Sequence, residues 1–266
     1  DRSPTGWFSP EAARHIDMAE FECDPSALHF GFASWNDFFI RRFKPGARPV
    51  AAPGDPAVVV SACEAFPYNI QTGARYRDQF WLKTQPYSLV DIFTAARADL
   101  AQRFVGGIVY QAFLSATNYH RWHAPVAGRV VAAYNVPGTY YAEAASAGLD
   151  PAGPDNSQGY ITAVATRAVI VIDTGVQGLG QVACVFVGMA EISSCVIAVE
   201  TGQMLGKGDE IGWFQYGGST HCLIFEPGVE LSFVPQAPFN APATPVVRVN
   251  AALATVGPRL DGGGLA

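Results

Sequence analysis

Signals of helix initiation dominate the first part of the chain. Ser9 is a good capping residue directly before Pro10, and proline is well tolerated at the first helical position. Ser34 is followed three residues later by Asp37, a variant of the capping box, and an apolar run comes next. We therefore expect residues 1–45 to form an N-terminal helical segment.

A turn-rich connector and two regular elements follow this segment. The run 44–49 contains two prolines and a glycine, which favour turns. The apolar run 57–60 is predicted to be a buried strand. Ser88 precedes Asp91 by three residues and so repeats the capping pattern, which predicts a helix that continues to about Leu100.

β-Branched residues become common after about residue 106. Short apolar runs separated by turn residues are typical of a mostly antiparallel barrel or sandwich. These runs are 107–110, 129–134, 168–173, 181–187, 192–199 and 229–233. The predicted fold class is therefore α+β, with the helical N-terminal segment on a mostly antiparallel β barrel or sandwich core. We expect one main domain over residues 46–235 and a C-terminal extension, 236–266, that belongs to the same fold or frays.

The net charge of −6 and the pI near 5.3 narrow the range of partners. Because no basic field is present to displace counterions from phosphates, we expect no nucleic acid partner. The totals also provide little attraction to anionic lipid. A basic run spans residues 41–44, and we expect it to be a solvated helix end. No apolar stretch reaches the roughly 18 residues of a membrane span, and the expected location is the cytoplasm.

Five cysteines bear on redox state and metal binding. Their number is odd and no pair has CxxC spacing, so neither a disulfide framework nor a zinc knuckle is expected. The plain interpretation is reduced thiols in a cytosolic compartment. His120 and His123 are three residues apart, but two ligands do not make a zinc site, and we expect no metal.

Three polar segments stand out because apolar residues surround them. They contain Glu64 after an apolar run, two histidines within residues 119–125, and Ser219 after two glycines. Taken alone, Glu64 would be a salt-bridged or surface carboxylate. The Gly-Gly-Ser sequence would be a turn. No single segment identifies a function.

Together, and in this order, the three segments resemble the phosphatidylserine decarboxylase family of pyruvoyl enzymes. The motif Tyr-His-Arg-x-His-x-Pro begins at residue 119, and Gly-Ser-Thr follows about a hundred residues later. The likeness extends from about Phe32 to Phe233, some three-quarters of the chain. It implies a small-molecule or lipid substrate that carries an amine and a carboxylate.

The resemblance implies that the chain cuts itself between Gly218 and Ser219. In the family a carboxylate and the second histidine of the motif activate the serine, roles that fall here on Glu64 and His123. The hydroxyl attacks the preceding carbonyl carbon, and the resulting ester is broken by β-elimination. Hydrolysis then releases ammonia and leaves a pyruvoyl group, the expected cofactor, in place of Ser219. The two fragments are expected to stay associated, and the oligomeric state stays open.

The same resemblance assigns roles in decarboxylation. The pyruvoyl carbonyl would bind the substrate amine as a Schiff base and accept the electrons left as CO₂ departs. His120 is the expected general acid that protonates the substrate carbon. Trp122, Phe214 and Tyr216 are candidates for an apolar substrate pocket, with core packing as the alternative for each ring. We assign no role to His221.

Two departures from the family pattern indicate its soluble branch. Glu64-Ala65 replaces the usual Asp-Gly, and Gly217 stands where the family usually has leucine. Both features resemble L-tryptophan decarboxylase-like members, which act on free aromatic amino acids. The expected reaction is therefore decarboxylation of a free aromatic L-amino acid, tryptophan first, to its amine and CO₂. The alternatives are a phosphatidylserine decarboxylase at a membrane surface, a serine hydrolase that uses the same triad, and a non-enzymatic β-domain.

Overall fold

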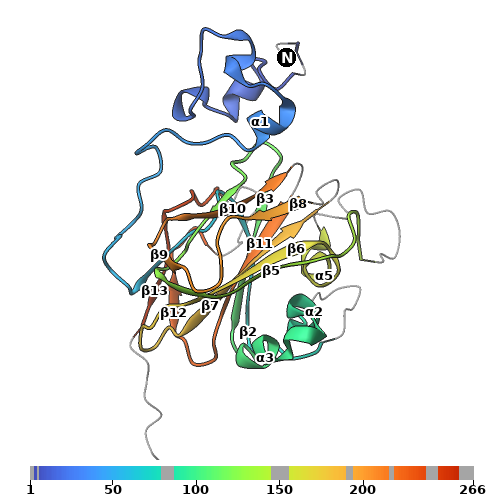
Figure 1. Cartoon of the computed structure of the whole chain (residues 1–266), viewed down its shortest axis with the longest axis vertical. Coiled ribbons are helices and arrows are strands. Elements are labelled where there is room, and N and C mark those ends of the chain that lie inside the picture. The colour runs from blue at the N-terminus through green and yellow to red at the C-terminus, as the bar shows by residue number, and fades with distance from the viewer. Residues whose placement is uncertain are drawn as a thin grey trace, which may run out of the picture.

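A seven-stranded antiparallel sheet lies at the centre of the protein (Figure 1). The computed structural model describes residues 3–4, 6–78, 87–144, 156–189, 194–215, 219–237 and 245–257. In sheet order the strands are β2 (Phe66–Thr72), β3 (Ile108–Leu114), β11 (Ser219–Phe225), β7 (Gln181–Gly188), β6 (Arg167–Asp173), β5 (Gly128–Val136) and β9 (Met204–Leu205). Every neighbouring pair is antiparallel.

Two smaller antiparallel sheets of three strands each accompany the large one. The first consists of β1 (Val58–Val60), β13 (Ala252–Val256) and β12 (Leu231–Phe233). The second consists of β4 (Arg121–His123), β10 (Glu210–Gln215) and β8 (Ser194–Ile197), in that order. The expected antiparallel core is confirmed. None of the sheets closes on itself among the strands that the structure describes, so the expected barrel is not observed.

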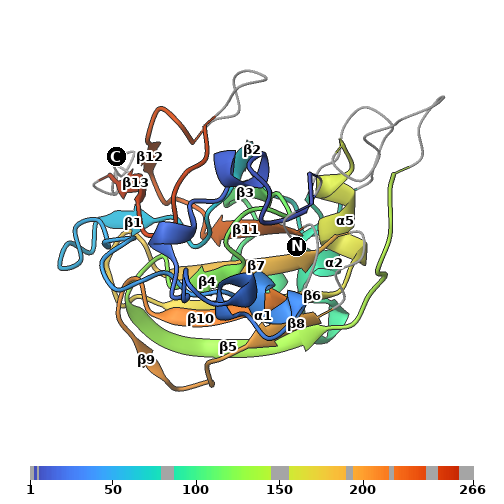
Figure 2. The same cartoon turned by 90° about the horizontal axis from the view of Figure 1, so that it is seen from above.

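Short helices cover one face of the large sheet. They are α2 (Leu89–Phe93), α3 (Ala98–Arg103) and α5 (Gln158–Val164), with a 3-10 turn at Ala95–Arg97 between the first two. Their apolar side chains join one core cluster with alternate residues of the central strands, such as Ile224. Figure 2, a view from above, shows α2 and α5 together at one side of the large sheet.

The second small sheet covers the opposite face. Trp122 of β4 and Phe214 of β10 meet Phe186 of β7 there, with Trp122 and Phe186 stacked at a centroid separation of 4.1 Å. Because both faces of the large sheet are covered, β6, β7 and β11 are buried along almost their whole length. Such strands show continuous apolar runs rather than alternation, which is the pattern their sequences carry.

The N-terminal segment is less helical than expected. It contains 3-10 turns at Ala12–Arg14, Met18–Glu20 and Leu28–Gly31, followed by helix α1 (Trp35–Phe39). The third turn cannot extend into a longer helix, because His29 and Phe30 adopt positive φ angles of 53° and 58°. No helix in the described ranges is long and apolar enough to cross a membrane.

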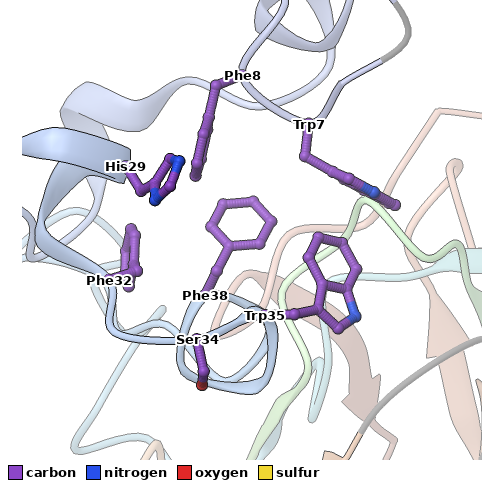
Figure 3. Close-up of a pocket in the computed structure, with 7 residues that line it drawn as sticks. All are labelled: Trp7, Phe8, His29, Phe32, Ser34, Trp35 and Phe38. Atoms are coloured by element: carbon purple, nitrogen blue, oxygen red, sulfur yellow. The ribbon is translucent and has the colours of Figure 1, made fainter. Parts of the chain in front are cut away.

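Aromatic side chains, rather than helices, hold the N-terminal segment together. Trp7 packs on Trp35 with ring centroids 4.5 Å apart, and Phe8 meets Phe38 edge-on at 5.1 Å. These rings and their neighbours line a cavity of about 240 Å³ (Figure 3). Figure 1 shows the segment at one end of the sheets. It is therefore a small packed unit with its own apolar centre.

The helix predicted from Ser88 is interrupted. Helix α2 ends at Phe93, because Thr94 has a φ of +74°, and the chain turns before α3 begins. For a β-branched residue this conformation is an outlier. Helix propensity in the sequence did not indicate this turn, because the turn depends on the packing of α2 and α3 on the large sheet.

The predicted strands are largely confirmed. The run 57–60 overlaps β1, and the six later runs overlap β3, β5, β6, β7, β8 and β12. Part of the run 192–199 lies outside the described residues. The runs did not predict strands β2, β4, β9, β10, β11 and β13 or helix α5.

Replacing Phe225 with alanine is expected to lower the free energy of unfolding by about 3–5 kcal/mol. Phe225 is fully buried at the end of β11, so truncation removes apolar contacts and leaves a void. Denaturant unfolding followed by circular dichroism measures the change, in a Ser219→Ala background in which the expected cleavage before residue 219 cannot occur. Leu28→Ala is the control, because Leu28 is 82% exposed. Equal effects of the two substitutions would contradict this packing.

Candidate functional site

Ser219 is the first residue of β11. It lies opposite Leu114 of β3 on one side and Gly188 of β7 on the other. Its side chain is completely buried, and its Oγ has no hydrogen-bond partner within the described part of the chain. Gly218, the other residue of the expected cleavage site, lies outside the described residues. A buried hydroxyl without a partner is costly, which marks this position as one that needs a functional explanation.

A polar network behind Ser219 fixes the beginning of β11. Thr220 points to the opposite face, where its hydroxyl donates to Gln158 Oε1 at 2.8 Å and accepts from Gln111 Nε2 at 3.0 Å. Tyr87 donates to Gln111 Oε1 at 2.6 Å. These buried bonds join β3, β11 and α5. The Ser219 backbone is thus held by side-chain bonds as well as by the sheet.

His120 and Trp122 face the same apolar layer as Ser219. The His120 ring is completely buried and stacks on Phe39 with centroids 3.9 Å apart. Its edge contact to Phe214 has a centroid distance of 6.4 Å, and Phe214 meets Trp122 at 4.8 Å. Two aromatic rings, Phe39 and Phe214, therefore lie against this histidine.

His123 lies on the other side of β4. Its Nδ1 lies 2.7 Å from the Gly208 carbonyl oxygen, which can only accept, so Nδ1 donates and Nε2 accepts from the Tyr119 hydroxyl at 2.9 Å. Burial lowers the pKa of His123, and this keeps the imidazole neutral. The ring lines a polar cavity together with Arg42 and Glu210.

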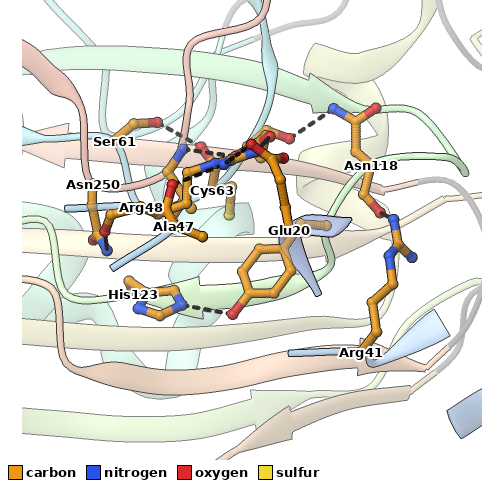
Figure 4. Close-up of polar contacts among 12 residues, drawn as sticks. Glu20, Arg41, Ala47, Arg48, Ser61, Cys63, Asn118, His123 and Asn250 are labelled. Atoms are coloured by element: carbon orange, nitrogen blue, oxygen red, sulfur yellow. Dashed lines mark hydrogen bonds and ion pairs between the residues drawn. The ribbon is translucent and has the colours of Figure 1, made fainter. Parts of the chain in front are cut away.

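Glu64 is paired with Arg48, which lines the same cavity as His123. Figure 4 shows Arg48, Glu20 and His123 among the polar side chains of this region. Arg48 donates to both carboxylate oxygens of Glu64 at 2.7 Å and to those of Glu20 at 2.8 and 2.9 Å. The Arg48 side chain is 7% exposed and lies over the Phe43 ring. Hydrogen bonds from Arg48 lower the pKa of Glu20, and the backbone N–H of Val249 also donates to Glu64.

Arg41 fixes the loop that leads into the histidine motif. Its guanidinium donates to the carbonyl oxygens of Thr117 and Asn118 at 2.8 and 3.1 Å. Asn118 in turn donates to the Glu64 carbonyl at 2.9 Å. Arg41 is only 3% exposed, so the expectation of a solvated basic run was wrong at this residue. Packing against Phe38 and backbone carbonyls, rather than charge, determines where it lies.

The candidate residues thus fall into two adjoining groups. Ser219, His120, Trp122 and Phe214 share the apolar layer between two sheets. Glu64 and His123 belong to the polar cluster around Arg48 and Tyr119. Arg48 and Tyr119 line both cavities of that cluster, whereas Glu64 lines one and His123 the other. Within the described chain, no hydrogen bond of Glu64 or His123 reaches Ser219. Tyr216 lies outside the described residues.

Sequence reasoning missed several supporting residues. Arg48 was part of a turn-rich connector, and Gln111 was hidden in an apolar run. Tyr119 is the first residue of the histidine motif, which was the only available signal for it.

All five cysteines are free. No group of three histidine, cysteine, aspartate or glutamate side chains in the described ranges could hold a metal ion.

His221 shares a face of β11 with Ser219, because side chains alternate along a strand. It is completely buried, and burial lowers its pKa to about 3. Its ring lies parallel to Phe186 at a centroid distance of 6.3 Å. The structure therefore places a second polar side chain beside the serine.

Comparison with known proteins identifies the family. Residues 35–246 match the family model described as phosphatidylserine decarboxylase. The chain is 39% identical to the decarboxylase iboD of Amanita muscaria, over 86% of this chain and 70% of that protein. It is 35% identical to the L-tryptophan decarboxylase of Psilocybe cubensis, over 94% of this chain and 60% of that protein. Phosphatidylserine decarboxylase proenzyme 3 of Schizosaccharomyces pombe is 31% identical over 75% of this chain and 19% of that protein.

The chain belongs to the phosphatidylserine decarboxylase family, and so to the carboxy-lyases. The resemblance inferred from the histidine and serine motifs is thereby confirmed. The Amanita muscaria and Psilocybe cubensis decarboxylases have a higher sequence identity to this chain than the Schizosaccharomyces pombe phosphatidylserine decarboxylase has.

Acid is expected to weaken the fold through His221. Its folded-state pKa of about 3 lies below the ordinary value of 6.5, so the unfolded chain binds the proton first as the pH falls. This contribution is fully present above about pH 6.5 and is lost at about 1.4 kcal/mol per pH unit below it. Unfolding free energies of Ser219→Ala and of Ser219→Ala with His221→Leu, measured between about pH 7 and pH 5, test this. The slope should be shallower in the leucine variant, whereas the same slope in both would exclude His221 as its source. His15→Leu is the control, because that histidine is exposed.

Proposed function

We propose that this chain is a self-processing, pyruvoyl-dependent decarboxylase of a free aromatic L-amino acid, tryptophan favoured, which yields the amine and CO₂. The observation that carries the proposal is the buried Oγ of Ser219, without a partner in the described chain, at the start of a strand within an aromatic layer. Family membership supports the reaction type, and the relative named L-tryptophan decarboxylase supports the substrate class.

Self-cleavage at Gly218–Ser219 is the first part of the proposal. The Ser219 hydroxyl attacks the Gly218 carbonyl carbon, His123 takes the hydroxyl proton, and Glu64 supports the charged imidazole. His123 holds its hydrogen on Nδ1 toward Gly208, so Nε2 is the nitrogen able to accept a proton. Tyr119 donates to that nitrogen, and therefore its hydroxyl must either move aside or pass the proton.

Glu64 needs a corresponding change of partner. Its carboxylate is held by two short hydrogen bonds from Arg48. Support of a charged His123 requires the carboxylate to share its charge between the guanidinium and the imidazole. The two cavities that meet at Arg48 and Tyr119 provide room for side-chain movement.

The architecture supports continued association of the two fragments. Cleavage before Ser219 would leave β11, β12 and β13 on the C-terminal fragment. Strand β11 pairs along its whole length with β3 on one side and β7 on the other. Because the fragment contributes an interior strand of the large sheet, its separation would break the ladders of β11 with β3 and β7 and that of β13 with β1. It would also expose both core clusters.

The surroundings of Ser219 fit the precursor of a pyruvoyl group. The position is completely buried in an apolar layer, and the serine Oγ is bonded to no described group. The pyruvoyl group would supply an electron-accepting carbonyl to which the substrate amine binds. His120, stacked on Phe39, is the proposed general acid that delivers a proton to the substrate carbon. Trp122 and Phe214, with Tyr216 from outside the described ranges, are the proposed walls of the substrate pocket.

The alternative substrate is phosphatidylserine at a membrane surface, with phosphatidylethanolamine as the product. The family membership and the relatives named phosphatidylserine decarboxylase support this alternative. Its headgroup carries the same amine and carboxylate as a free amino acid, so the catalytic residues would serve either substrate. The aromatic layer next to Ser219 favours an aromatic side chain.

The purified protein is expected to contain two fragments that meet at Gly218–Ser219. Denaturing mass spectrometry should detect a C-terminal fragment that starts at position 219 without a free amino terminus. Ser219→Ala should give one uncut chain, because the attacking hydroxyl is missing. Ser232→Ala, an exposed serine on β12, is the control and should be processed normally.

Histidine variants test the division of labour within this processing. His123→Ala should block cleavage. His120→Ala should be cut normally but lose roughly 10²–10⁴-fold in turnover, the range expected for a general acid. An uncut His120→Ala protein would contradict the separate roles, and an uncut wild-type chain would contradict self-processing.

Release of CO₂ is expected from tryptophan in preference to phosphatidylserine. Radiolabelled tryptophan, tyrosine, phenylalanine and phosphatidylserine vesicles are supplied in parallel to the wild-type protein. Ser219→Ala provides the blank, because it cannot form the pyruvoyl group. Turnover of the lipid alone would exclude an amino acid substrate, and no turnover of any of them would exclude the proposed function.

A further inference from the structure

His221 is a polar side chain in a position that packing alone would give to an apolar one. The ring is completely buried on the face of β11 that joins the core between the large sheet and the β4-β10-β8 sheet. The Ala112 carbonyl lies near enough to favour the protonated ring weakly. Neither ring nitrogen, however, forms a hydrogen bond within the described residues. Leaving such groups unsatisfied costs about 1–3 kcal/mol, so the residue calls for a role.

The position of His221 relative to Ser219 suggests that role. The two residues point to the same face of β11 and are about 6.7 Å apart along the strand, at about 3.3–3.4 Å per residue. On the neighbouring strands His221 is opposite Ala112, which offers only a methyl group, and Phe186. An amino acid attached through its amine at position 219 could reach His221 with an extended aromatic side chain.

Aromatic rings flank His221 on two sides. On one side Phe186 lies parallel to it and stacks in turn on Trp122. On the other side Tyr110 meets its edge at a centroid distance of 6.1 Å and stacks on Phe233 at 5.8 Å. Planar surfaces of this kind suit a planar ligand ring.

The charge state of His221 limits what it can recognise. The ring stays neutral, because burial lowers its pKa to about 3. A neutral imidazole has one donor and one acceptor nitrogen, and it offers no charge to a carboxylate. In either neutral form one ring nitrogen carries no hydrogen, and this acceptor requires an N–H or O–H group.

We propose that His221 is a specificity residue, whose acceptor nitrogen binds an N–H or O–H group on the ring of the substrate. This inference rests on the proposed function, since it assumes an aromatic amino acid bound at position 219. The substrate class is narrowed to side chains such as indole and phenol, which carry a ring donor. Phenylalanine, which has none, leaves the imidazole unsatisfied and binds less well.

The test compares tryptophan with 3-benzothienylalanine, in which sulfur replaces the indole N–H in a ring of nearly the same shape. Wild-type protein should prefer tryptophan by about tenfold in kcat/KM, the value of one neutral hydrogen bond. His221→Leu should process itself normally and should turn over both compounds with equal kcat/KM. Leu223→Met is the matched control, because it changes the next residue on the same face and should keep the tenfold preference.

A second measurement does not depend on turnover. The ¹⁵N chemical shifts of the His221 imidazole report hydrogen bonding at each nitrogen in isotope-labelled wild-type protein. Tryptamine should shift the acceptor nitrogen, whereas phenethylamine should not. This readout remains usable if His221→Leu fails to fold.

The outcomes separate the two proposals. Wild-type protein without activity on any aromatic amino acid would overturn the proposed function and this inference with it. Activity on tryptophan, with the same preference in wild type and His221→Leu or the same ¹⁵N response to both amines, would overturn the role of His221 alone. Loss of the preference in His221→Leu only, together with a shift caused by tryptamine only, supports it.

Discussion

Strand β11 pairs along its full length with β3 and with β7, and the arrangement of the site depends on this double ladder. Seven residues, Ser219 to Phe225, have a partner on each side. A shift of one residue would exchange the two faces of the strand and turn Ser219 and His221 toward the helices. Such a shift is opposed by Thr220, whose hydroxyl bonds Gln111 and Gln158 on the helix face. The place of the serine therefore follows from the register of the strand more than from contacts of its own.

Alternation along β4 and β11 sorts polar side chains into two environments with different chemistry. Toward the sheet–sheet core lie Ser219, His221 and His120, which are completely buried among apolar rings, and burial lowers the pKa of His221. Toward the N-terminal segment lie His123 and the ion pairs of Arg48, where each charge has a partner. The first environment suits loss of CO₂ from a bound substrate. The second contains the histidine and the carboxylate that the proposed self-processing would use to handle a proton.

The N-terminal segment packs on the sheets through Phe39 and also contributes to the polar environment. Glu20 completes the pairing of Arg48, and Arg41 holds the backbone just before the histidine motif. Buried arginines hold their carbonyl or carboxylate partners in a fixed position, although burying the charge costs desolvation free energy. Removal of one partner is destabilising, because it leaves the other buried and unsatisfied. The segment is thus part of the structure that positions Glu64 and His123, the candidates for self-processing.

The sequence by itself determined about half of the strands and the candidate catalytic residues. Continuous apolar runs predicted β6 and β7, because strands covered on both faces need no alternation. The motif spacing identified the family, which the comparisons confirmed. The same motifs singled out Ser219 and His123 as candidate catalytic residues. Local signals misjudged the helix after Ser88, since the reversal at Thr94 is imposed by packing on the sheet.

Only the tertiary structure decided which polar residues share an environment. Strand β11 was not predicted, because its first three residues are polar and only the four that follow are apolar. Without that strand, the common face of Ser219 and His221 could not be derived. Pairing across more than a hundred residues also brings β3 to β11. Arg48 meets Glu64 and Glu20, which are 16 and 28 residues away in the sequence. Such long-range pairing depends on burial and register in the assembled sheets, which no local stretch of sequence specifies.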